Sequence, residues 1–385
     1  GYDGRIALIG DEPVPPYQRP PLSKKYLAGE VGRDRIALHP EQFFTDNDID
    51  CMFGVCVDRI EPDRQRLVLA DGARLAFDGL LIATGSRSRP LPVPGATQPA
   101  VHSIRKISDV DALAPSLVSG QRLIIIGGGY IGLEVAAMAR SAGLDVRILE
   151  GATRLMARTS ASVLSDHFLR LHRSHGVQVE LGARLERLEA TGHGVSVRTA
   201  ERAYEADLVL VGIGGLANQE LAASAGLATD NGIVVDGMCR TSAPSIYAAG
   251  DCCSFPSAKY GRRIRLESVQ NAIDQAKAAA LAMLGKGAPY DPVPWFWSDQ
   301  FDTKLQIAGL SQGADNVVLR GDMDAPGFSV AYLKGGRLIA LDAVNQPKDY
   351  MMARCLVPGS FQANERDLSD PDVSLRDLVA APSPA

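Results

Sequence analysis

The clearest sequence of apolar segments lies between residues 123 and 150. Leu123–Ile126 is a short apolar run that predicts a buried parallel strand. Apolar residues then recur at helical spacing over Ile131–Ala142, with small residues on one face. The run "DVRILE", Asp145–Glu150, predicts the next strand, so the segment as a whole predicts a βαβ unit.

Three further apolar runs predict strands that end in a glycine or an acidic residue, which is where nucleotide-binding loops begin. They are "GRIALIGDE", which reaches Asp11, "LLIATGSRSRP", in which Ala83, Thr84 and Gly85 follow the strand, and "SIYAAGDCC", which ends in Gly250 and Asp251. The segment "ESVQNAIDQAKAAALAML", from Glu267, predicts a helix with Ala272, Ala276, Ala279 and Ala280 on a small-residue face.

The turn inside the βαβ unit has the G-x-G-x-x-G pattern of dinucleotide-binding loops. Gly127 permits the tight turn, Gly129 lets a pyrophosphate approach the backbone, and Gly132 lets the helix and strand pack closely. Glu150 follows Gly132 by 18 residues, where an acid accepts a hydrogen bond from a ribose hydroxyl. A carboxylate there repels a 2′-phosphate, so we expect NADH to be preferred over NADPH.

A second dinucleotide-binding domain is indicated at the N-terminus. Asp11 ends its strand in the way that the second strand of such a unit ends, yet a strand, glycine loop and helix of about 30 residues would normally precede it. Those residues are absent from this sequence, and we therefore expect the natural protein to be longer. The motif at Gly127 would then be the second of two, in a domain that interrupts the first.

Composition narrows the function classes. A chain of 385 residues is long enough for two or three domains, and it has no apolar run that could cross a bilayer. With no signal peptide visible, we expect a cytoplasmic protein. The net charge of -5 offers no basic footprint for nucleic acid, so neither nucleic acid nor a membrane is an expected partner.

Taken together, these motifs resemble those of a known family, the two-dinucleotide-fold flavoprotein reductases. Within it, the chain resembles the FAD-containing, NADH-dependent ferredoxin reductases of the putidaredoxin reductase and palustrisredoxin reductase type, which serve bacterial P450 and Rieske oxygenase systems. The resemblance covers nearly the whole chain, through "PYQRPPLSKKYL", "ATGSRSRPL", "GGGYIGLEVAA", "VGIG", "YAAGDC", "ESVQNAIDQA", "PWFWSDQ" and "KLQIAGL" in family order.

The resemblance implies a fold and a domain plan. The expected fold is α/β, with two Rossmann-like dinucleotide-binding domains, as in glutathione reductase, and a C-terminal α+β domain. Residues 1–106 and 228–292 would form the FAD-binding domain, 107–227 the NADH-binding domain and 293–385 the C-terminal domain.

The resemblance also implies site residues. Asp11 would hold the adenosine ribose of FAD, Arg19 and Lys24 would lie beside the flavin, and Lys24 would pair with Glu134 of "IGLE". Around the FAD phosphates and ribitol it implies Ala83, Thr84, Gly85, Gly250 and Asp251. The N-terminus of the helix at Ser268 and Val269 would point at the flavin, although some relatives carry tryptophan in place of Val269.

Gly212 would lie in the turn beside the nicotinamide, in "GIGG", where the family usually has a bulkier residue than Gly215. Trp297 would lie near the flavin edge. No metal site is expected.

The resemblance implies electron transfer from NADH through FAD to a [2Fe-2S] ferredoxin, with Lys24, Glu134 and Trp297 closest to the chemistry. Ferredoxins of this kind are typically acidic, and Arg262, Arg263 and Arg265 in "GRRIRLES" supply a candidate docking patch. Alternatively, those charges form only a solvated loop. Relatives of this size are commonly monomers, so a monomer is expected.

Two other functions compete with this interpretation. Cys51 and Cys56 have the spacing of a redox dithiol, but they lie in a segment that predicts paired strands, where residues five apart point to opposite faces. A disulfide reductase is therefore disfavoured. A flavoprotein that binds NADH as a sensor or scaffold remains open. His167, His172 and His175 lie on an amphipathic helix end for which we expect a solvated face, without a metal-ligand pattern.

Overall fold

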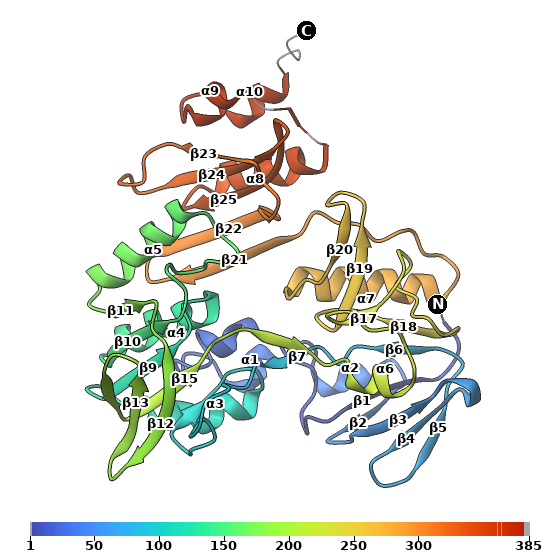
Figure 1. Ribbon diagram of the computed structural model, residues 1–385. Coiled ribbons are helices and arrows are strands. Elements are labelled where there is room, and N and C mark those ends of the chain that lie inside the picture. Colours follow the sequence, from blue (N-terminus) through green and yellow to red (C-terminus); the bar gives the residue numbers. More distant parts are fainter. Residues whose placement is uncertain (1, 360, 363, 381–385) are drawn as a thin grey trace. The chain divides into compact units, whose positions relative to one another are not determined.

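The computed structural model describes residues 2–359, 361–362 and 364–380, which fold into two compact units (Figure 1). The first unit consists of the chain up to Pro21, Gly29–Arg87 and Gly215–Pro292. The second consists of Leu22–Ala28, Ser88–Gly214 and the chain from Val293 onward. The domain boundaries at residues 106, 227 and 292 that the resemblance implies stay a prediction.

A five-stranded parallel sheet forms the first half of the second unit. Its strands, in spatial order, are β11 (Gln178–Leu181), β10 (Asp145–Glu150), β9 (Arg122–Ile126), β15 (Leu208–Val211) and β8 (Val101–His102). From β9 the sequence runs outward through β10 to β11 and then returns to β15 on the other side of β9. The sheet therefore has a topological switch point between β9 and β15, where open α/β sheets bind their ligands.

The apolar run that predicted a strand forms the centre of this sheet. Leu123, Ile124 and Ile125 of β9 are almost fully buried, because helices and a second sheet cover the two faces. Helix α4 (Tyr130–Ser141) connects β9 to β10 and packs against both strands. The helices of this half are α3 (Ile107–Leu113), α4 and α5 (Ser162–Ser174), with the 3-10 turn η3 (Ala114–Ser116). A separate antiparallel sheet of three strands consists of β12 (Leu185–Thr191), β13 (Gly194–Thr199) and β14 (Ala203–Ala206).

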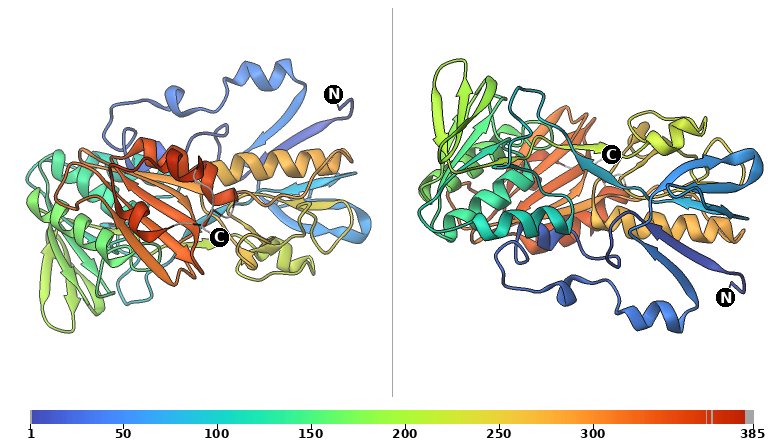
Figure 2. Two further views of the ribbon diagram at one scale, coloured as in Figure 1. Left: turned by 90° about the horizontal axis from the view of Figure 1, so that it is seen from above. Right: turned by 90° about the horizontal axis from the view of Figure 1, so that it is seen from below.

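The second half of the second unit is an antiparallel sheet covered by helices (Figure 2). Its strands, in spatial order, are β21 (Trp295–Gln300), β22 (Thr303–Gly309), β25 (Arg337–Val344), β24 (Phe328–Lys334) and β23 (Asn316–Arg320). The helices are α8 (Pro347–Leu356), the 3-10 turn η4 (Val357–Gly359), α9 (Glu365–Ser369) and α10 (Leu375–Ala380). Helix α8 packs on β22 and β25, and α9 packs on β23.

The first unit is assembled from shorter sheets. Two are parallel pairs, β1 (Ile6–Gly10) with β2 (Ile49–Phe53) and β6 (Leu80–Ile82) with β18 (Ile246–Ala248). The others join β3 (Val57–Glu61), β4 (Arg66–Leu69) and β5 (Arg74–Ala76), then β17 (Ile233–Val234), β19 (Cys253–Ser257) and β20 (Arg262–Ile264), and then β7 (Ser86–Ser88) and β16 (Gly215–Ala217). The helices are α1 (Arg33–Ile36), α2 (Glu41–Asp46), α6 (Glu220–Ser224) and α7 (Val269–Met283), with the 3-10 turn η2 (Pro62–Arg64). The 3-10 turn η1 (Pro20–Ser23) begins in this unit and ends in the segment Leu22–Ala28 of the second.

The structure corrects two local expectations. The segment around Cys51 and Cys56 does contain paired strands, β3 with β4, but the two cysteines do not share a strand, because Cys51 lies in β2 and Cys56 precedes β3. The predicted solvated face of the helix that carries His172 is also wrong at that residue, whose exposed fraction is 0%. Within the described residues, no helix is long and apolar enough to cross a lipid bilayer.

Candidate functional site

The glycine loop after β9 has the backbone geometry that its sequence pattern predicts. Gly127 adopts a φ of +109°, and a Cβ atom there would lie 2.5 Å from the carbonyl oxygen of Gly212. A Cβ on Gly132 would lie 2.3 Å from the carbonyl oxygen of Gly127. Both glycines are therefore required by close approach of one backbone to another.

Gly129 differs from its two neighbours in the motif. A Cβ built on this residue meets no atom within 4 Å, so the loop backbone is open on that side. Gly129 is also the N-cap residue of α4, whose first amide groups are available to an anion. The open space beside a helix N-terminus fits the pyrophosphate of a dinucleotide.

Glu150 ends β10 next to this loop. Its carboxylate accepts hydrogen bonds from the backbone amides of Gly128, at 2.5 Å, and Ala152, at 2.7 Å. These two bonds fix a negative charge beside the loop. Gly212 follows β15 on the other side of the switch point, and its amide donates to the carbonyl oxygen of Ile126, the last residue of β9.

A buried carboxylate and a lysine meet elsewhere in the second unit. Glu134 lies on α4 with 5% of its surface exposed, and its Oε1 atom is 2.8 Å from Nζ of Lys24. The hydroxyl of Ser23 donates to Oε2 at 2.7 Å, and the hydroxyl of Ser298 donates to Oε1 at 2.8 Å. A buried carboxylate without such partners would be strongly destabilising, so these three donors account for its presence. The predicted pair of Lys24 and Glu134 is therefore brought together.

Trp297 lies on β21, half-buried, two residues from Trp295. The two indole rings stack with their centroids 5.8 Å apart. Trp295 packs on the core of the C-terminal sheet, and the guanidinium of Arg354 lies 4.9 Å from its ring centroid. Trp295 is thus the core aromatic of the pair, which leaves Trp297 as the candidate for a functional role.

In the first unit, Asp251 and the strand ends around it come together. The hydroxyl of Ser86 donates to the Asp251 carboxylate at 3.1 Å. Gly250 has a φ of +84°, and its amide donates at 2.8 Å to the side chain of Gln275 on α7. Gly85, at a φ of +66°, makes the corresponding turn after β6. Two turns that follow parallel strands thus lie at one edge of the pair β6–β18.

The neighbouring positions Ala83 and Thr84 are exposed, and the Thr84 hydroxyl donates to the carbonyl oxygen of Asn218 at 2.6 Å. Helix α7 begins at Val269, with Ser268 as its N-cap, and the Ser268 hydroxyl accepts from the Asn271 amide at 3.2 Å. Val269 is 37% exposed. The amide groups at this helix N-terminus fit the predicted contact with an electron-rich ring.

Asp11 and Arg19 complete the predicted set in the first unit, and both are exposed. Asp11 directly follows β1. Arg19 forms an ion pair with Glu12 at 2.7 Å, and the hydroxyl of Tyr17 donates to the same carboxylate at 2.5 Å. Arg19 is therefore held by an acidic neighbour that the sequence interpretation did not include.

The structure gives a reason why Gly215 of the turn "GIGG" is smaller than the residue usual in the family. A Cβ on Gly215 would lie 3.0 Å from a carboxylate oxygen of Glu267, so the Glu267 side chain occupies the space of a bulkier residue. Glu267 in turn forms an ion pair with Arg265.

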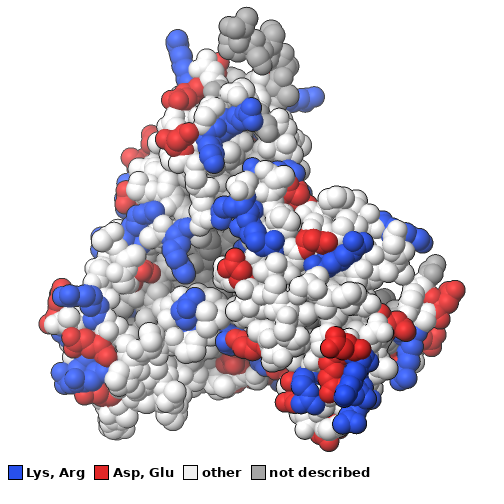
Figure 3. Space-filling model, turned by 45° about the vertical axis from the view of Figure 1, so that its right-hand side comes forward, with Lys and Arg blue, Asp and Glu red and all other residues white. Residues whose placement is uncertain are grey.

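The three arginines of the predicted docking patch are not equivalent. Arg263 donates to the backbone carbonyl oxygens of Val235 and Ser254. The Arg265 side chain is only 12% exposed and pairs with Glu267. Arg262 is the exposed member. On the face that Figure 3 shows, basic side chains lie beside acidic ones at several places.

Comparisons with known proteins agree with this geometry. Residues 1–276 match the family model "Pyridine nucleotide-disulphide oxidoreductase", and residues 295–379 match "Reductase C-terminal". The chain is 44% identical to rhodocoxin reductase of Rhodococcus erythropolis, over 99% of this chain and 90% of that protein. It is 42% identical to the 5,5'-dehydrodivanillate O-demethylase ferredoxin reductase subunit of a Sphingobium species, over 99% of this chain and 93% of that protein. It matches the reductase in a crystal structure of the covalent putidaredoxin reductase-putidaredoxin complex with a TM-score of 0.96, at 39% identity, over 99% of this chain and 93% of that one.

The chain belongs to the ferredoxin reductases of this oxidoreductase family. The predicted fold class, two dinucleotide-binding folds followed by a C-terminal α+β domain, is confirmed for this reductase. The family membership that the motifs predicted is confirmed as well, and it implies FAD and a pyridine nucleotide as cofactors.

The sequence interpretation missed four residues of the polar contacts that lead to Glu134: Ser23, Ser298, Gln300 and His172. The hydroxyls of Ser23 and Ser298 contact Glu134 directly, while Gln300 and His172 extend the contact beyond Ser298. A signal for two of them was present, because Ser298 and Gln300 are alternate polar positions directly after the aromatic run Trp295–Trp297. Their partner could not be named without the fold.

Cys51 and Cys56 of the first unit are not joined by a disulfide bond. Cys51 lies half-buried in β2, and Cys56 is exposed just before β3. Both are free thiols, and the Cys56 thiol contacts the carbonyl oxygen of Val57.

Proposed function

We propose that this reductase transfers electrons from NADH, through FAD, to a [2Fe-2S] ferredoxin that supplies a cytochrome P450 or a Rieske oxygenase in the cytoplasm. One NADH and two oxidised ferredoxins give NAD⁺, two reduced ferredoxins and a proton. Bound FAD would supply the chemistry that connects a two-electron donor to a one-electron acceptor.

The observation that carries the proposal is the loop from Gly127 to Gly132 with Glu150 beside it. The loop offers open space at Gly129 for a pyrophosphate, and the Glu150 carboxylate is already fixed by two amide donors. A fixed carboxylate accepts a hydrogen bond from a free ribose 2′-hydroxyl and repels a 2′-phosphate. This supports NADH as the preferred electron donor.

The remaining site residues divide by unit, and each has a role that its contacts support. In the second unit, Lys24 carries a cation fixed by Glu134, which would stabilise negative charge on the reduced flavin, and Trp297 offers an aromatic surface. In the first unit, Asp251 is fixed by Ser86 and would hold the ribitol and phosphate part of FAD.

The remaining members of the proposed site act mainly through backbone groups or strand ends. We assign to FAD binding Asp11, Arg19, Ala83, Thr84, Gly85, Gly250, Ser268 and Val269, and to NADH binding Gly127, Gly129, Gly132, Glu150 and Gly212.

For ferredoxin docking we propose Arg262, the exposed member of the arginine cluster. Arg263 and Arg265 hold their own unit together, so reversing their charge would disturb the fold as well as the surface. The positive charge of Arg262 would mainly increase the rate at which an acidic partner associates with the reductase. The reductase is proposed to act as a monomer.

Anaerobic stopped-flow kinetics tests the whole proposal. FAD-loaded protein is mixed first with NADH and then with a [2Fe-2S] ferredoxin from the same cell. Rapid flavin bleaching followed by one-electron reduction of the iron-sulfur cluster is expected. Turnover with a disulfide but not with ferredoxin would support a disulfide reductase. A persistent charge-transfer band with neither acceptor would support the NADH-binding sensor.

Docking is tested separately with Arg262→Glu, and Arg74→Glu on β5 is the matched control. The first variant should slow ferredoxin reduction about tenfold at low ionic strength and leave NADH-to-ferricyanide turnover unchanged. The control should change neither. Equal loss of both activities in Arg262→Glu would reject the docking role.

A further inference from the structure

Strand β21 presents two different faces, because successive side chains of a strand point in opposite directions. Trp295 and Trp297 share one face and stack on each other. Phe296, Ser298 and Gln300 share the other face. The Phe296 ring lies 4.9 Å from that of Tyr130, the first residue of α4, so this second face is turned toward α4.

The polar residues of that face continue the contacts of Glu134 into the protein. Gln300 donates from Nε2 to the Ser298 hydroxyl at 3.2 Å, and its Oε1 atom is 2.9 Å from Nε2 of His172 on α5. Ser298, Gln300 and His172 each have an exposed fraction of 0%. Four buried polar side chains thus form one chain from α5, through β21, to α4.

The direction of every hydrogen bond in this chain follows from the carboxylate at its end. An ionised Glu134 can only accept, so the Ser298 hydroxyl must donate to it. The Ser298 oxygen therefore accepts from the NH₂ group of Gln300, and Gln300 turns its carbonyl oxygen toward His172. His172 must then donate from Nε2, and in a neutral ring Nδ1 therefore carries no proton.

The surroundings of His172 agree with this assignment. Within the described part of the chain, Nδ1 is buried and has no hydrogen-bond partner, which costs less for a bare nitrogen than it would for an N–H group. Burial lowers the pKa of His172 to about 4, although the hydrogen bond with Gln300 opposes the shift. The ring is therefore neutral near pH 7, so His172 adds no positive charge to this chain of contacts.

We propose that Ser298, Gln300 and His172 are positioning residues for the reductase reaction. They orient the Glu134 carboxylate, and through it the Lys24 ammonium, so that β21 of the C-terminal domain completes the reactive site built on α4. The inference rests on the proposed function in one respect, which is that Lys24 faces the flavin. Ser298 makes the critical contact, because it shares Oε1 of Glu134 with Lys24.

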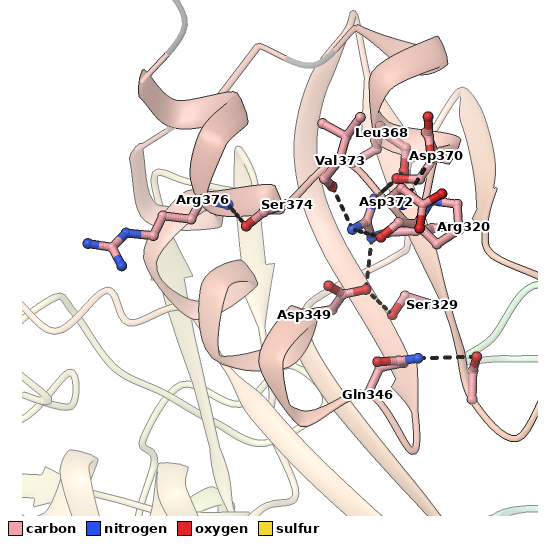
Figure 4. Close-up of polar contacts among 12 residues, drawn as sticks. Arg320, Ser329, Gln346, Asp349, Leu368, Asp370, Asp372, Val373, Ser374 and Arg376 are labelled. Atoms are coloured by element: carbon pink, nitrogen blue, oxygen red, sulfur yellow. Dashed lines mark hydrogen bonds and ion pairs between the residues drawn. The ribbon is translucent and has the colours of Figure 1, made fainter.

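The test uses Ser298→Ala with Ser329→Ala as the matched control. Ser329 is also 0% exposed, lies in the same C-terminal sheet, and donates to a carboxylate, that of Asp349, at 2.9 Å (Figure 4). Three properties are measured on the FAD-loaded proteins: kcat and KM for NADH with ferricyanide, the midpoint potential of the bound flavin, and stability in urea.

A hydrogen bond to a charged group has a net effect on the order of a tenfold change in rate or more. We therefore expect Ser298→Ala to lower kcat about tenfold and leave KM for NADH within about twofold. Its flavin potential should become more negative, because a less well oriented Lys24 stabilises the reduced flavin less. Ser298→Thr, which keeps the hydroxyl, should restore most of both properties. Ser329→Ala should lose stability without changing kcat or the potential.

An unchanged potential and kcat in Ser298→Ala would overturn the proposal, and so would equal kinetic losses in Ser298→Ala and Ser329→Ala. The potential is measured by chemical reduction and needs neither NADH nor ferredoxin. A failure of the proposed function would appear as absent transfer to ferredoxin in the wild type, and it would leave this comparison of potentials intact.

Discussion

The variant Asp342→Asn should be more stable than the wild type, by a margin that grows as the pH rises. Asp342 lies on β25 with 1% of its surface exposed, and the hydroxyl of Tyr332 donates to its Oδ2 atom at 2.6 Å. The Tyr332 oxygen itself accepts from the backbone amide of Ala161, which joins the two halves of the second unit. Burial raises the pKa of Asp342 from 3.8 to about 7.

The sign of the pH dependence follows from the two states of the chain. Below about pH 4 Asp342 is protonated in both the folded and the unfolded protein, so it adds no pH dependence. Between about pH 4 and pH 7 the unfolded chain ionises while the folded protein keeps its proton, and stability falls with rising pH. Each unit of pKa difference corresponds to about 1.4 kcal/mol, so the total reaches about 4 kcal/mol above pH 7.

Asparagine removes this ionisation and keeps the shape of the side chain. Its carbonyl oxygen can still accept from Tyr332, so the variant and the wild type should be similar in stability near pH 4. The advantage of the variant should then grow by about 1.4 kcal/mol per pH unit and level off above pH 7.

Urea unfolding followed by tryptophan fluorescence between pH 4.5 and pH 8 measures the difference. The chain contains two tryptophans, Trp295 and Trp297, and both lie in the second unit with Asp342, so the signal reports on that unit. Val318→Ala, in strand β23 of the same sheet, is the control and should shift stability equally at every pH. Parallel stability curves for the wild type and Asp342→Asn would refute the reasoning.

Three further predictions follow from the same contacts. The wild type should lose up to about 3 kcal/mol of stability as the pH drops from 6.5 toward 4, because the folded protein keeps His172 neutral while the unfolded chain protonates it. The variant His172→Gln should lack this loss. Urea unfolding of both proteins at pH 5 and pH 7 measures the difference. Glu150→Ala should raise the ratio of kcat/KM for NADPH to that for NADH about tenfold, since the carboxylate that repels a 2′-phosphate is gone, and an unchanged ratio in steady-state kinetics would contradict the assignment. The double variant Cys51→Ser and Cys56→Ser should keep NADH-to-ferricyanide turnover within about twofold, because the two thiols lie outside the proposed site; a large loss would return attention to disulfide chemistry.

The backbone geometry of the glycine loop, Gly127–Gly132, could be predicted almost completely from the sequence. Its chemistry depends on backbone conformation and close approach at Gly127 and Gly132, and only glycine permits these, so residue type and spacing specify the geometry. The acid at Glu150 is equally local, because it ends the strand that follows α4. The pair of Lys24 and Glu134 was reached through family resemblance, since nothing local connects residues so far apart.

Side-chain environments across long sequence separations could not be predicted. The pattern of α5 predicted a solvated face for His172, but a polar strand covers that residue, and a helical pattern does not specify what packs against it. The three arginines predicted for docking gave a similar result. Three charges in a short run looked equivalent, yet Arg262 is exposed, while Arg263 donates to backbone carbonyls and Arg265 pairs with an acid of its own unit.

The sequence by itself therefore determined what depends on neighbours along the chain, namely the parallel strands, the glycine turns and the acid at the strand end. The tertiary structure alone decided which side chains meet around Glu134, because its partners Ser23 and Ser298 are 111 and 164 residues away. The physical reason is that a buried carboxylate needs donors at hydrogen-bond distance in three dimensions, and strand alternation and helix packing supply them from whichever segments the fold brings together.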